Sequence, residues 1–394
     1  MKIVVIGAVA AGSKAAAKIK RENPDAEVVV YSKGRDISYA GCGLPYYVGG
    51  DIETREELIV NAPAKFAALT GAEVHTGQEA VGLDAPRHCV QIRSTADGTV
   101  QEVGYDKLIL ATGAVPFVPK MEGLDLDGVF TVRTPDDAVN IRTYIEKNGC
   151  KKAVVVGAGF IGMEMAENLM GQGLSVTVMD LTSQIMPIVL DPEMADYAQR
   201  HLRRQGLKIL TNTGVQSIRG QGQVSAVATA AGELPADLVI LCVGIRPATE
   251  FLNGSGIEME KGAIVVDDTM STNLPDIYAA GDCALVKNRV TGARQWSAMG
   301  STANIAARIM AKGICGGTQT YPGCLGTGVA KIAKDLNVGR TGLSEQQAKD
   351  AGYQVITALS VAPDKAHYYP GGADFVTKLI ADAQTGKLLG MQVM

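Results

Sequence analysis

One cysteine of this chain stands in a setting that suits redox chemistry. Cys42 lies between two glycines in the run SYAGCGLPYY, which covers residues 38–47. Pro45 is well suited to the first turn of a helix, so we expect the Cys42 sulfur to lie near a helix N-terminus, where a thiolate is stabilised. The residues alone leave a second interpretation open, in which Cys42 is a small side chain buried in a turn.

Two glycine-rich turns predict sites for dinucleotides. Each follows a short apolar run and precedes a helix-like stretch and a second strand-like run, which is the order of a βαβ unit. In such a unit the glycines let the backbone approach a pyrophosphate, and the helix N-terminus binds the phosphates. The first unit comprises residues 2–6, Gly7–Gly12, a helix to about Glu22 and residues 27–31; the second comprises residues 153–156, Gly157–Gly162, a helix to about Gln172 and residues 175–180.

The second unit is the more regular of the two. Its glycines have the GxGxxG spacing, and Asp180 follows the last of them, Gly162, by 18 residues, where a carboxylate binds a ribose 2′-OH. No cation follows Asp180 to bind a 2′-phosphate, so we expect NADH to be preferred over NADPH. The first unit has Val9 in place of the middle glycine and Ser32 in place of the acid.

The composition is that of a globular chain with more than one domain. A chain of 394 residues is too long for one compact core. Its composition, 46% hydrophobic and 20% charged, excludes a disordered or fibrous protein. A net charge of −4 argues against binding to nucleic acid or to an anionic membrane. The seven cysteines are scattered and include no CxxC pair, which argues against a disulfide framework and favours the reducing cytoplasm. The four histidines also lack the spacing of metal ligands, which argues against a zinc site. No apolar run reaches the roughly 18 to 20 residues of a membrane span.

Taken together, these features resemble the FAD-dependent pyridine nucleotide–disulfide oxidoreductases. The similarity is to their single-cysteine branch, which contains coenzyme A disulfide reductases, NADH-dependent persulfide reductases, NADH oxidases and NADH peroxidases. It extends over essentially the whole chain and includes the stretches Ala111–Gly113 and Tyr278–Asp282. Members with two redox cysteines carry the second one five residues after the first, and here that residue is Tyr47. The resemblance therefore implies that Cys42 is the lone redox cysteine beside the flavin.

The resemblance also implies the fold and the domain order. We expect an α/β fold with two Rossmann-like dinucleotide-binding domains, one for FAD and one for NAD, and a C-terminal α+β dimerisation domain. The FAD domain is expected to span residues 1–113 and 245–318, the NAD domain 114–244, and the dimerisation domain 319–394. Because the chain ends in a strand-like segment, this last domain is expected to be shortened relative to the family. Alternating apolar residues predict antiparallel strands in it, over residues 354–361, 375–381 and 388–393.

The same resemblance assigns contacts with the cofactors residue by residue. It implies that Asp282 binds the ribityl chain of FAD. The residues that it implies at FAD or NADH are Gly7, Val9, Ala10, Ala11, Gly12, Ser32, Lys33, Ala80, Ala111, Thr112, Gly113, Arg133, Gly157, Gly159, Phe160, Ile161, Gly162, Glu164, Asp180, Gly244, Gly281, Asp282, Met299 and Gly300.

The branch is indicated by the first glycine turn and by a segment near the C-terminus. NADH peroxidases and many NADH oxidases carry a His where this chain has Ala10, whereas Gly7–Gly12 and Asp364–Gly371 are similar to coenzyme A disulfide and persulfide reductases. That group uses a Tyr of this segment near the substrate disulfide, across a homodimer, which makes Tyr368 and Tyr369 candidates for the same role. Interface packing is the alternative role for both tyrosines.

A stripe of cations follows the first helix. Lys14, Lys18 and Arg21 recur at i, i+4 and i+7, and the family places the coenzyme A nucleotide near this helix. We expect these three residues, together with Ser38 and Gly41, to bind the substrate, since cationic side chains bind phosphates well. A solvated charged face of the helix is the alternative.

The expected function is electron transfer from NADH through FAD and Cys42 to a small disulfide or persulfide, with coenzyme A disulfide or persulfide as the favoured substrate. Two alternatives stay open: a water-forming NADH oxidase that uses a Cys42 sulfenic acid, and a flavin-bearing redox sensor or interaction protein. Two departures from the family bear on this expectation. Ser32 replaces the usual acid at the FAD ribose, and Gly41 replaces an Asn that often precedes the redox cysteine.

Overall fold

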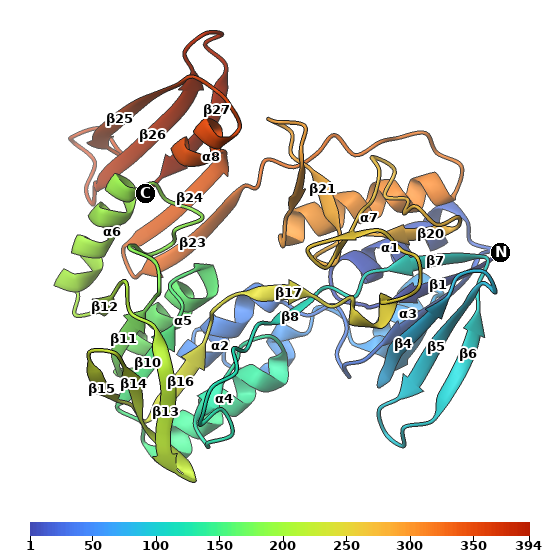
Figure 1. Cartoon of the computed structure of the whole chain (residues 1–394), viewed down its shortest axis with the longest axis horizontal. Coiled ribbons are helices and arrows are strands. Elements are labelled where there is room, and N and C mark those ends of the chain that lie inside the picture. Colours follow the sequence, from blue (N-terminus) through green and yellow to red (C-terminus); the bar gives the residue numbers. More distant parts are fainter. The chain divides into compact units, whose positions relative to one another are not determined.

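The computed structural model describes residues 1–394, which form two compact units (Figure 1). The first unit consists of residues 1–40, 56–115 and 245–324, and the second of residues 41–55, 116–244 and 325–394. The segment 41–55 contains Cys42 and was expected to belong with residues 1–113, but it groups with the second unit. The contacts of this segment explain the difference and are described with the site.

The first unit is built on a five-stranded sheet in the order β20-β7-β1-β2-β3. β1 pairs in parallel with both β2 and β7, and α1 connects β1 to β2, so the first predicted βαβ unit is confirmed. Ile3 and Val5 of β1 are buried on one face of the sheet, and Val4 and Ile6 are buried on the other. Burial on both faces explains the continuous Val and Ile runs. The strands are β1 Lys2–Ile6, β2 Glu27–Ser32, β3 Glu73–Thr76, β7 Lys107–Leu110 and β20 Ile277–Ala279.

Helices cover one face of this sheet, and a small antiparallel sheet covers the other. α1 and α7 share one apolar core, to which α1 contributes Ala15 and Ala16 and α7 contributes Ala303 and Ala307. These small side chains let the two helices lie close together. The elements are α1 Ala11–Glu22, α3 Pro63–Thr70, α7 Gly300–Ile314, β4 Gln78–Asp84, β5 Cys89–Ser94 and β6 Val100–Gly104.

The second unit contains a sheet of the same kind, in the order β12-β11-β10-β16-β9. β10 pairs in parallel with β11 and β16, which confirms the second predicted βαβ unit. A three-stranded antiparallel sheet, β13-β14-β15, shares an apolar core with β10 and β16. The elements are β9 Val129–Phe130, β10 Lys152–Val156, β11 Ser175–Met179, β12 Lys208–Leu210, β13 Val215–Gln221, β14 Gln223–Thr229, β15 Gly232–Pro235, β16 Leu238–Leu241, α2 Leu44–Gly49, α4 Pro135–Asn148, α5 Phe160–Gly171 and α6 Pro192–Arg204.

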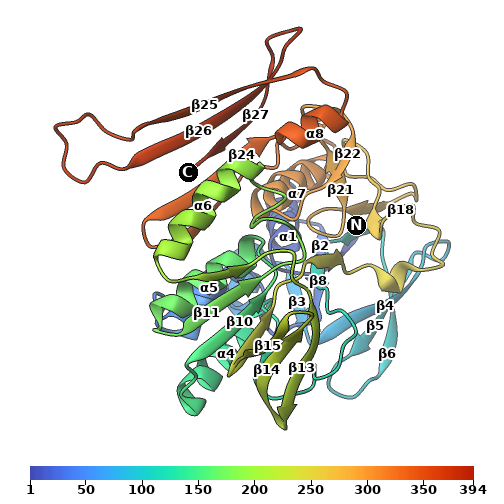
Figure 2. The same cartoon turned by 60° about the vertical axis from the view of Figure 1, so that its left-hand side comes forward.

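The C-terminal part of the second unit is an antiparallel sheet in the order β23-β24-β27-β26-β25, with the short helix α8. The three strands expected from alternating apolar residues are β25, β26 and β27, so this prediction is confirmed. Figure 2 shows β25 and β26 as a long hairpin. Apolar side chains of β25 are exposed, among them Ile356, Leu359 and Val361. The elements are β23 Gly328–Ala333, β24 Leu336–Gly342, β25 Val355–Pro363, β26 Asp374–Asp382, β27 Leu388–Val393 and α8 Glu345–Asp350.

Short elements complete the chain. No helix has both the length and the apolar composition that crossing a bilayer requires. No group of three His, Cys, Asp or Glu side chains is arranged to bind a metal ion. The remaining elements are β8 Ala114–Pro116, β17 Ile245–Pro247, β18 Met259–Glu260, β19 Ala263–Ile264, β21 Leu285–Lys287, β22 Arg294–Trp296, and the 3₁₀ helices η1 Gly41–Gly43, η2 Arg55–Leu58 and η3 Glu250–Leu252.

Candidate functional site

The first glycine turn connects β1 to α1 in a conformation that only glycine fits. Gly7 has φ +97°, and a Cβ atom there would lie 2.1 Å from the carbonyl oxygen of Ala111. A Cβ atom on Gly12 would lie 1.8 Å from the carbonyl oxygen of Gly7. α1 begins after Ala10, whose side chain cannot accept a hydrogen bond from the first turn. The backbone N–H groups of this turn therefore suit a phosphate.

Further residues at the same edge of the first sheet fit a dinucleotide. Thr112 follows β7, and its Oγ1 is buried without a hydrogen-bond partner. Gly281 follows β20 with φ +88°, and a Cβ atom there would lie 3.1 Å from Cβ of Ala11. The carboxyl ends of adjacent parallel strands are where such sheets bind nucleotides. Residues 7–12, 111–113 and 280–282, which sequence reasoning assigned to FAD, all follow these strand ends.

Other residues predicted at FAD lie in the first unit without a geometric feature that points to a nucleotide. Ser32 is buried at the end of β2, and Ala80 is half-buried in β4. The ammonium of Lys33 lies 2.8 Å from the Glu79 carboxylate, and this contact, with one from Arg93, holds the pKa of Glu79 below its usual range. The charge of Lys33 is thus already neutralised. Met299 and Gly300 form the start of α7.

The second glycine turn repeats the geometry of the first. A Cβ atom on Gly157 would lie 2.2 Å from the carbonyl oxygen of Cys242, and one on Gly162 would lie 1.9 Å from that of Gly157. Gly159 differs from these two, because no atom lies within 4 Å of the position of its Cβ. The middle glycine thus leaves open space where a pyrophosphate would approach. α5 also begins without a side-chain cap.

Asp180 follows β11 and is held beside the second glycine turn. Its Oδ2 accepts a hydrogen bond from the Ala158 backbone N–H at 2.7 Å, and its Oδ1 accepts one from the Thr182 backbone N–H at 2.8 Å. A carboxylate has about four acceptor positions, so capacity remains for a ribose hydroxyl. The next residue, Leu181, is 77% exposed and offers no positive charge to a 2′-phosphate.

The remaining residues predicted at NADH lie elsewhere in the second unit. Glu164 of α5 is largely buried, and burial, reinforced by the nearby Glu167 carboxylate, raises its pKa to about 7. Ile161 is 39% exposed on the same helix, whereas Phe160 begins it. Gly244 has φ +115° after β16. The backbone N–H of Arg133 donates to the side chain of Asp137 at 3.0 Å, next to the N-terminus of α4.

Cys42 lies in the 3₁₀ turn Gly41–Gly43, directly before α2, and it is exposed. Pro45 stands in the first turn of α2, as the sequence predicted. No atom lies within 4 Å of a Cβ placed on Gly41, so the surface beside Cys42 is open. None of the seven cysteines is joined to another in a disulfide.

Long-range contacts attach the Cys42 segment to the second unit. One guanidinium nitrogen of Arg142 in α4 donates to the carbonyl oxygens of Tyr47, Ile52 and Glu53, at 3.4, 3.3 and 3.1 Å. Its guanidinium carbon also lies 5.0 Å from the centre of the Tyr47 ring. Gln172 donates to the carbonyl oxygen of Gly49. These contacts explain why residues 41–55 group with the second unit.

Charged groups lie near α2. Tyr46, four residues after Cys42, has its pKa raised by burial and by the nearby carboxylates of Glu164 and Glu167. Lys331 of β23 lies 2.9 Å from Glu167 and partly opposes that effect. Glu164, on the predicted NADH-binding helix, thus lies close enough to the helix that follows Cys42 to affect the pKa of Tyr46.

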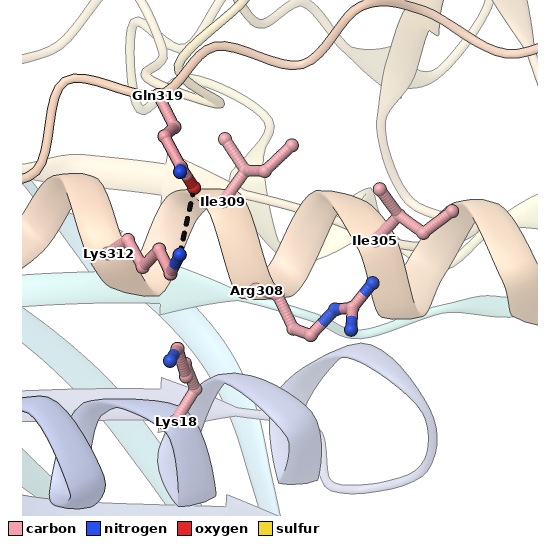
Figure 3. A pocket seen from close by; sticks show the side chains of 6 residues that line it. All are labelled: Lys18, Ile305, Arg308, Ile309, Lys312 and Gln319. Carbon is pink, nitrogen blue, oxygen red and sulfur yellow. Dashed lines mark hydrogen bonds between the residues drawn. The ribbon is translucent and has the colours of Figure 1, made fainter.

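A pocket of about 380 Å³ lies between α1 and α7 (Figure 3). Three cationic side chains line it: Lys18 from α1, and Arg308 and Lys312 from α7. Figure 3 shows Lys18 extending from α1 toward α7 and Arg308 extending from α7 toward α1. The other lining residues are Ile305, Ile309 and Gln319. A pocket with three cations and two isoleucines suits an anionic ligand that also carries an apolar ring.

The predicted cation stripe contributes only one residue to this pocket. Lys18 lines it and also forms an ion pair with Glu22, whereas Lys14 and Arg21 do not line it. Sequence reasoning missed Arg308 and Lys312, although their i, i+4 spacing on an otherwise apolar helix is a signal that could have identified them. Ser38 has φ 51°, and its backbone N–H donates to the carbonyl oxygen of Ala8.

The two candidate tyrosines lie in the turn between β25 and β26. Tyr368 and Tyr369 are 73% and 60% exposed, and their ring centres are 5.3 Å apart. His367 packs against Tyr368. Their side chains are therefore available at the surface of this unit.

Comparisons with known proteins identify the family. Residues 1–303 match the model of the pyridine nucleotide-disulphide oxidoreductases, and residues 330–394 match the dimerisation domain of the same family. An NADH oxidase of Methanocaldococcus jannaschii is 37% identical over 100% of this chain and 87% of its own length. A CoA-dependent NAD(P)H sulfur oxidoreductase of Pyrococcus furiosus is 37% identical over 100% of this chain and 88% of its own length.

A solved structure agrees with both the fold and the family. The NAD-dependent persulfide reductase of A. fulgidus superposes with a TM-score of 0.96 at 38% identity, covering 100% of this chain and 73% of that one. The expected α/β fold with a C-terminal dimerisation domain is thereby confirmed. This chain belongs to the pyridine nucleotide-disulphide oxidoreductase family, and it is an oxidoreductase that uses FAD and NADH.

Proposed function

We propose that this enzyme uses NADH to reduce coenzyme A disulfide or coenzyme A persulfide through Cys42. The observation that carries this proposal is the pocket between α1 and α7, where Lys18, Arg308 and Lys312 offer three positive charges beside two isoleucines. Coenzyme A combines an adenine ring with several phosphate groups, which matches that lining. The name of the Pyrococcus furiosus relative also includes dependence on coenzyme A.

The chain's own residues would hold the two dinucleotides at the two glycine turns. The turn at Gly7–Gly12, with Thr112 and Asp282, would bind the FAD pyrophosphate and ribityl chain. The turn at Gly157–Gly162 would bind the NADH pyrophosphate, and the Asp180 carboxylate would accept a hydrogen bond from the 2′-OH of the adenosine ribose. Bound FAD supplies the two-electron chemistry between NADH and sulfur.

Cys42 would act as the nucleophile on the substrate. Its thiolate attacks one sulfur of coenzyme A disulfide, forms a Cys42–coenzyme A disulfide and releases the other coenzyme A as a thiolate, which takes up a proton. Two electrons from one NADH then cleave the Cys42–coenzyme A disulfide, which releases the second coenzyme A and restores the thiolate. Position 47, where two-cysteine relatives have their second thiol, is a Tyr here. This supports a mixed disulfide with the substrate, since no thiol at that position can displace the bound coenzyme A.

A homodimer with a shared active site is part of this proposal. The match to the dimerisation domain and the exposed apolar side chains of β25 support association with a second copy. Tyr368 and Tyr369 would then donate from one subunit to the leaving thiolate in the site of the other. The cytoplasmic location stays a prediction.

A water-forming NADH oxidase is the second candidate function. The name of the Methanocaldococcus jannaschii relative favours it, and the exposed Cys42 would serve as a sulfenic acid in that cycle. Oxygen carries no phosphate, so this reaction gives the α1–α7 pocket no role.

The two candidates are separated by the acceptor that accelerates NADH oxidation. The FAD-loaded enzyme is assayed anaerobically with coenzyme A disulfide, polysulfide and peroxide, and in air with an oxygen electrode. We expect the highest kcat/KM with coenzyme A disulfide or persulfide and loss of that activity in Cys42→Ser. NADH oxidation that matches oxygen uptake, with no acceleration by coenzyme A disulfide, supports the oxidase instead.

A further inference from the structure

The segment of residues 181–191 connects the predicted ribose-binding residue to α6 without regular secondary structure. It folds back onto the second glycine turn, where the backbone N–H of Met186 donates to the carbonyl oxygen of Ala158 at 2.8 Å. Met186 adopts φ 48°, and it is fully buried together with Ile185. The backbone of Ala158 is therefore held at both ends, since its N–H donates to Asp180 and its carbonyl oxygen accepts from Met186.

The end of this segment is bound to the C-terminal sheet by a reciprocal pair of hydrogen bonds. The backbone N–H of Asp191 donates to Oε1 of Gln392 in β27 at 2.8 Å, and Nε2 of Gln392 donates to Oδ2 of Asp191 at 2.8 Å. Both side chains are buried, and Gln392 is only 1% exposed. A buried amide that satisfies a backbone N–H and a carboxylate at once fixes the geometry of both.

The carboxylate of Asp191 is used in an unusual way. Asp191 is the N-cap residue of α6, yet its side chain accepts no hydrogen bond from that helix. Its Oδ2 instead lies 2.9 Å from Nζ of the buried Lys378 of β26 and accepts from the backbone N–H of Glu345 at 3.2 Å. An Asp at this position normally contributes about 1 kcal/mol as a helix cap. That stabilisation is given up for contacts between the segment and the C-terminal sheet.

A second contact holds the middle of the segment. The guanidinium of Arg340 in β24 donates to the carbonyl oxygen of Ile188. Burial lowers the pKa of Arg340, and the nearby Asp191 partly opposes this shift. Arg340 thus contacts Ile188 and Gln392 contacts Asp191, from two neighbouring strands of one sheet.

We propose that Gln392 and Arg340 are positioning residues for NADH, which hold residues 181–191 against the second glycine turn so that Asp180 is preorganised for the ribose. This inference rests on the placement of NADH at that turn. It assigns the C-terminal sheet a part in binding the nicotinamide cofactor of its own chain, in addition to any part in dimerisation. An irregular segment of this length would otherwise lose conformational entropy when NADH binds.

The test compares Gln392→Leu and Arg340→Met with wild-type holoenzyme. Titration of the oxidised holoenzyme with NAD⁺, which binds at the same turn and cannot reduce FAD, gives a dissociation constant for the nicotinamide cofactor. Hydrogen exchange gives the protection of the Met186 amide. We expect the cofactor to bind roughly ten- to thirtyfold more weakly in Gln392→Leu, which loses two buried hydrogen bonds, and roughly threefold more weakly in Arg340→Met, which loses one exposed hydrogen bond. KM for NADH should rise in step while kcat at saturating NADH stays near that of wild type, and the Met186 amide should exchange faster. Arg340→Lys, which keeps a donor, should restore much of the affinity.

Thr385→Ala is the matched control, because it removes a hydrogen bond to Asp382 in the turn between β26 and β27 without touching residues 181–191. Equal NAD⁺ affinity and equal KM for NADH in Gln392→Leu, Arg340→Met and this control overturn the inference. If Gln392→Leu does not fold, Arg340→Met carries the test. Asp180→Ala separates the two levels of the argument: normal NADH affinity in that variant refutes the placement of NADH, whereas weakened binding there with unchanged binding in Arg340→Met refutes only the positioning role.

Discussion

Arg308 offers a sharp test of coenzyme A as the substrate. Of the three cations in the pocket, Lys18 is paired with Glu22 and Lys312 donates to Gln319 at 3.0 Å, whereas the guanidinium of Arg308 forms neither an ion pair nor a hydrogen bond. Arg308→Ala therefore removes a guanidinium whose N–H groups are available to bind a phosphate. A well-made charge-assisted hydrogen bond contributes about 1.5 to 3 kcal/mol, and exposure to solvent moves this toward the lower value.

From that magnitude we expect Arg308→Ala to lower kcat/KM for coenzyme A disulfide roughly ten- to thirtyfold, mainly by raising KM. The assay is anaerobic NADH oxidation with coenzyme A disulfide and, in parallel, with a small uncharged disulfide. Raising the salt concentration should weaken only the coenzyme A reaction of the wild type, because the contact is electrostatic. Arg294→Ala, which removes an exposed arginine of the same unit that does not line the pocket, is the control. An equal loss with both disulfides, or no loss with either, refutes the assignment of the pocket.

The other residues of the site give three further predictions. Cys42→Ser should keep bound FAD and its reduction by NADH but lose disulfide reduction, as stopped-flow absorbance and acceptor assays would reveal; disulfide reduction at the wild-type rate would assign the chemistry to another thiol. Asp180→Ala should narrow a preference for NADH over NADPH that we expect to be roughly tenfold or more in kcat/KM, since a carboxylate repels a 2′-phosphate by about 1 to 3 kcal/mol; equal use of both cofactors by the wild type would contradict this. The pKa of Glu164 is raised to about 7, so its ionisation should lower the stability of the wild type as the pH rises from about 4.5 to 7. Glu164→Gln should therefore be more stable than wild type by about 2 to 3 kcal/mol at pH 8 but not at pH 4. Thermal unfolding at both pH values measures this stability difference, and a difference that does not change with pH would contradict the assignment of a buried charge to Glu164.

The parts of the fold that could be predicted from the sequence are those fixed by neighbouring residues. The run Lys2–Ile6 predicts β1 to the residue, and the predicted end of the first helix at Glu22 agrees with α1. Burial on both faces of a parallel sheet selects continuous Val and Ile, and the close backbone approach at Gly7 admits no side chain. Each of these signals is contained in fewer than about 30 residues of chain.

The parts that could not be predicted depend on residues far apart in the sequence. Arg142 attaches residues 47–53 to the second unit across about 90 positions, and nothing near Cys42 in the sequence signals that contact. Lys378 is 1% exposed although lysine is almost never fully buried without partners. Its three carboxylate partners all lie outside its own strand, in Asp191, Glu193 and Glu345. The α1–α7 pocket likewise combines Lys18 with Arg308, so the stripe on one helix could reveal only part of it.

The way the five longest helices begin supports the cofactor assignments independently of the motifs. α4 has a complete capping box, in which Thr134 accepts from a backbone N–H of its first turn. α6 begins at Asp191, whose carboxylate is directed to the C-terminal sheet. The remaining three, α1, α5 and α7, begin at Ala10, Gly159 and Met299, none of which caps the helix with its side chain. A helix N-terminus keeps unsatisfied N–H groups and a partial positive charge unless something binds there. Four of these five helices thus lack a side-chain cap, and the three other than α6 begin at residues that the sequence assigned to FAD or NADH. These three helices leave their first turns available to the cofactors' phosphates and other acceptor groups.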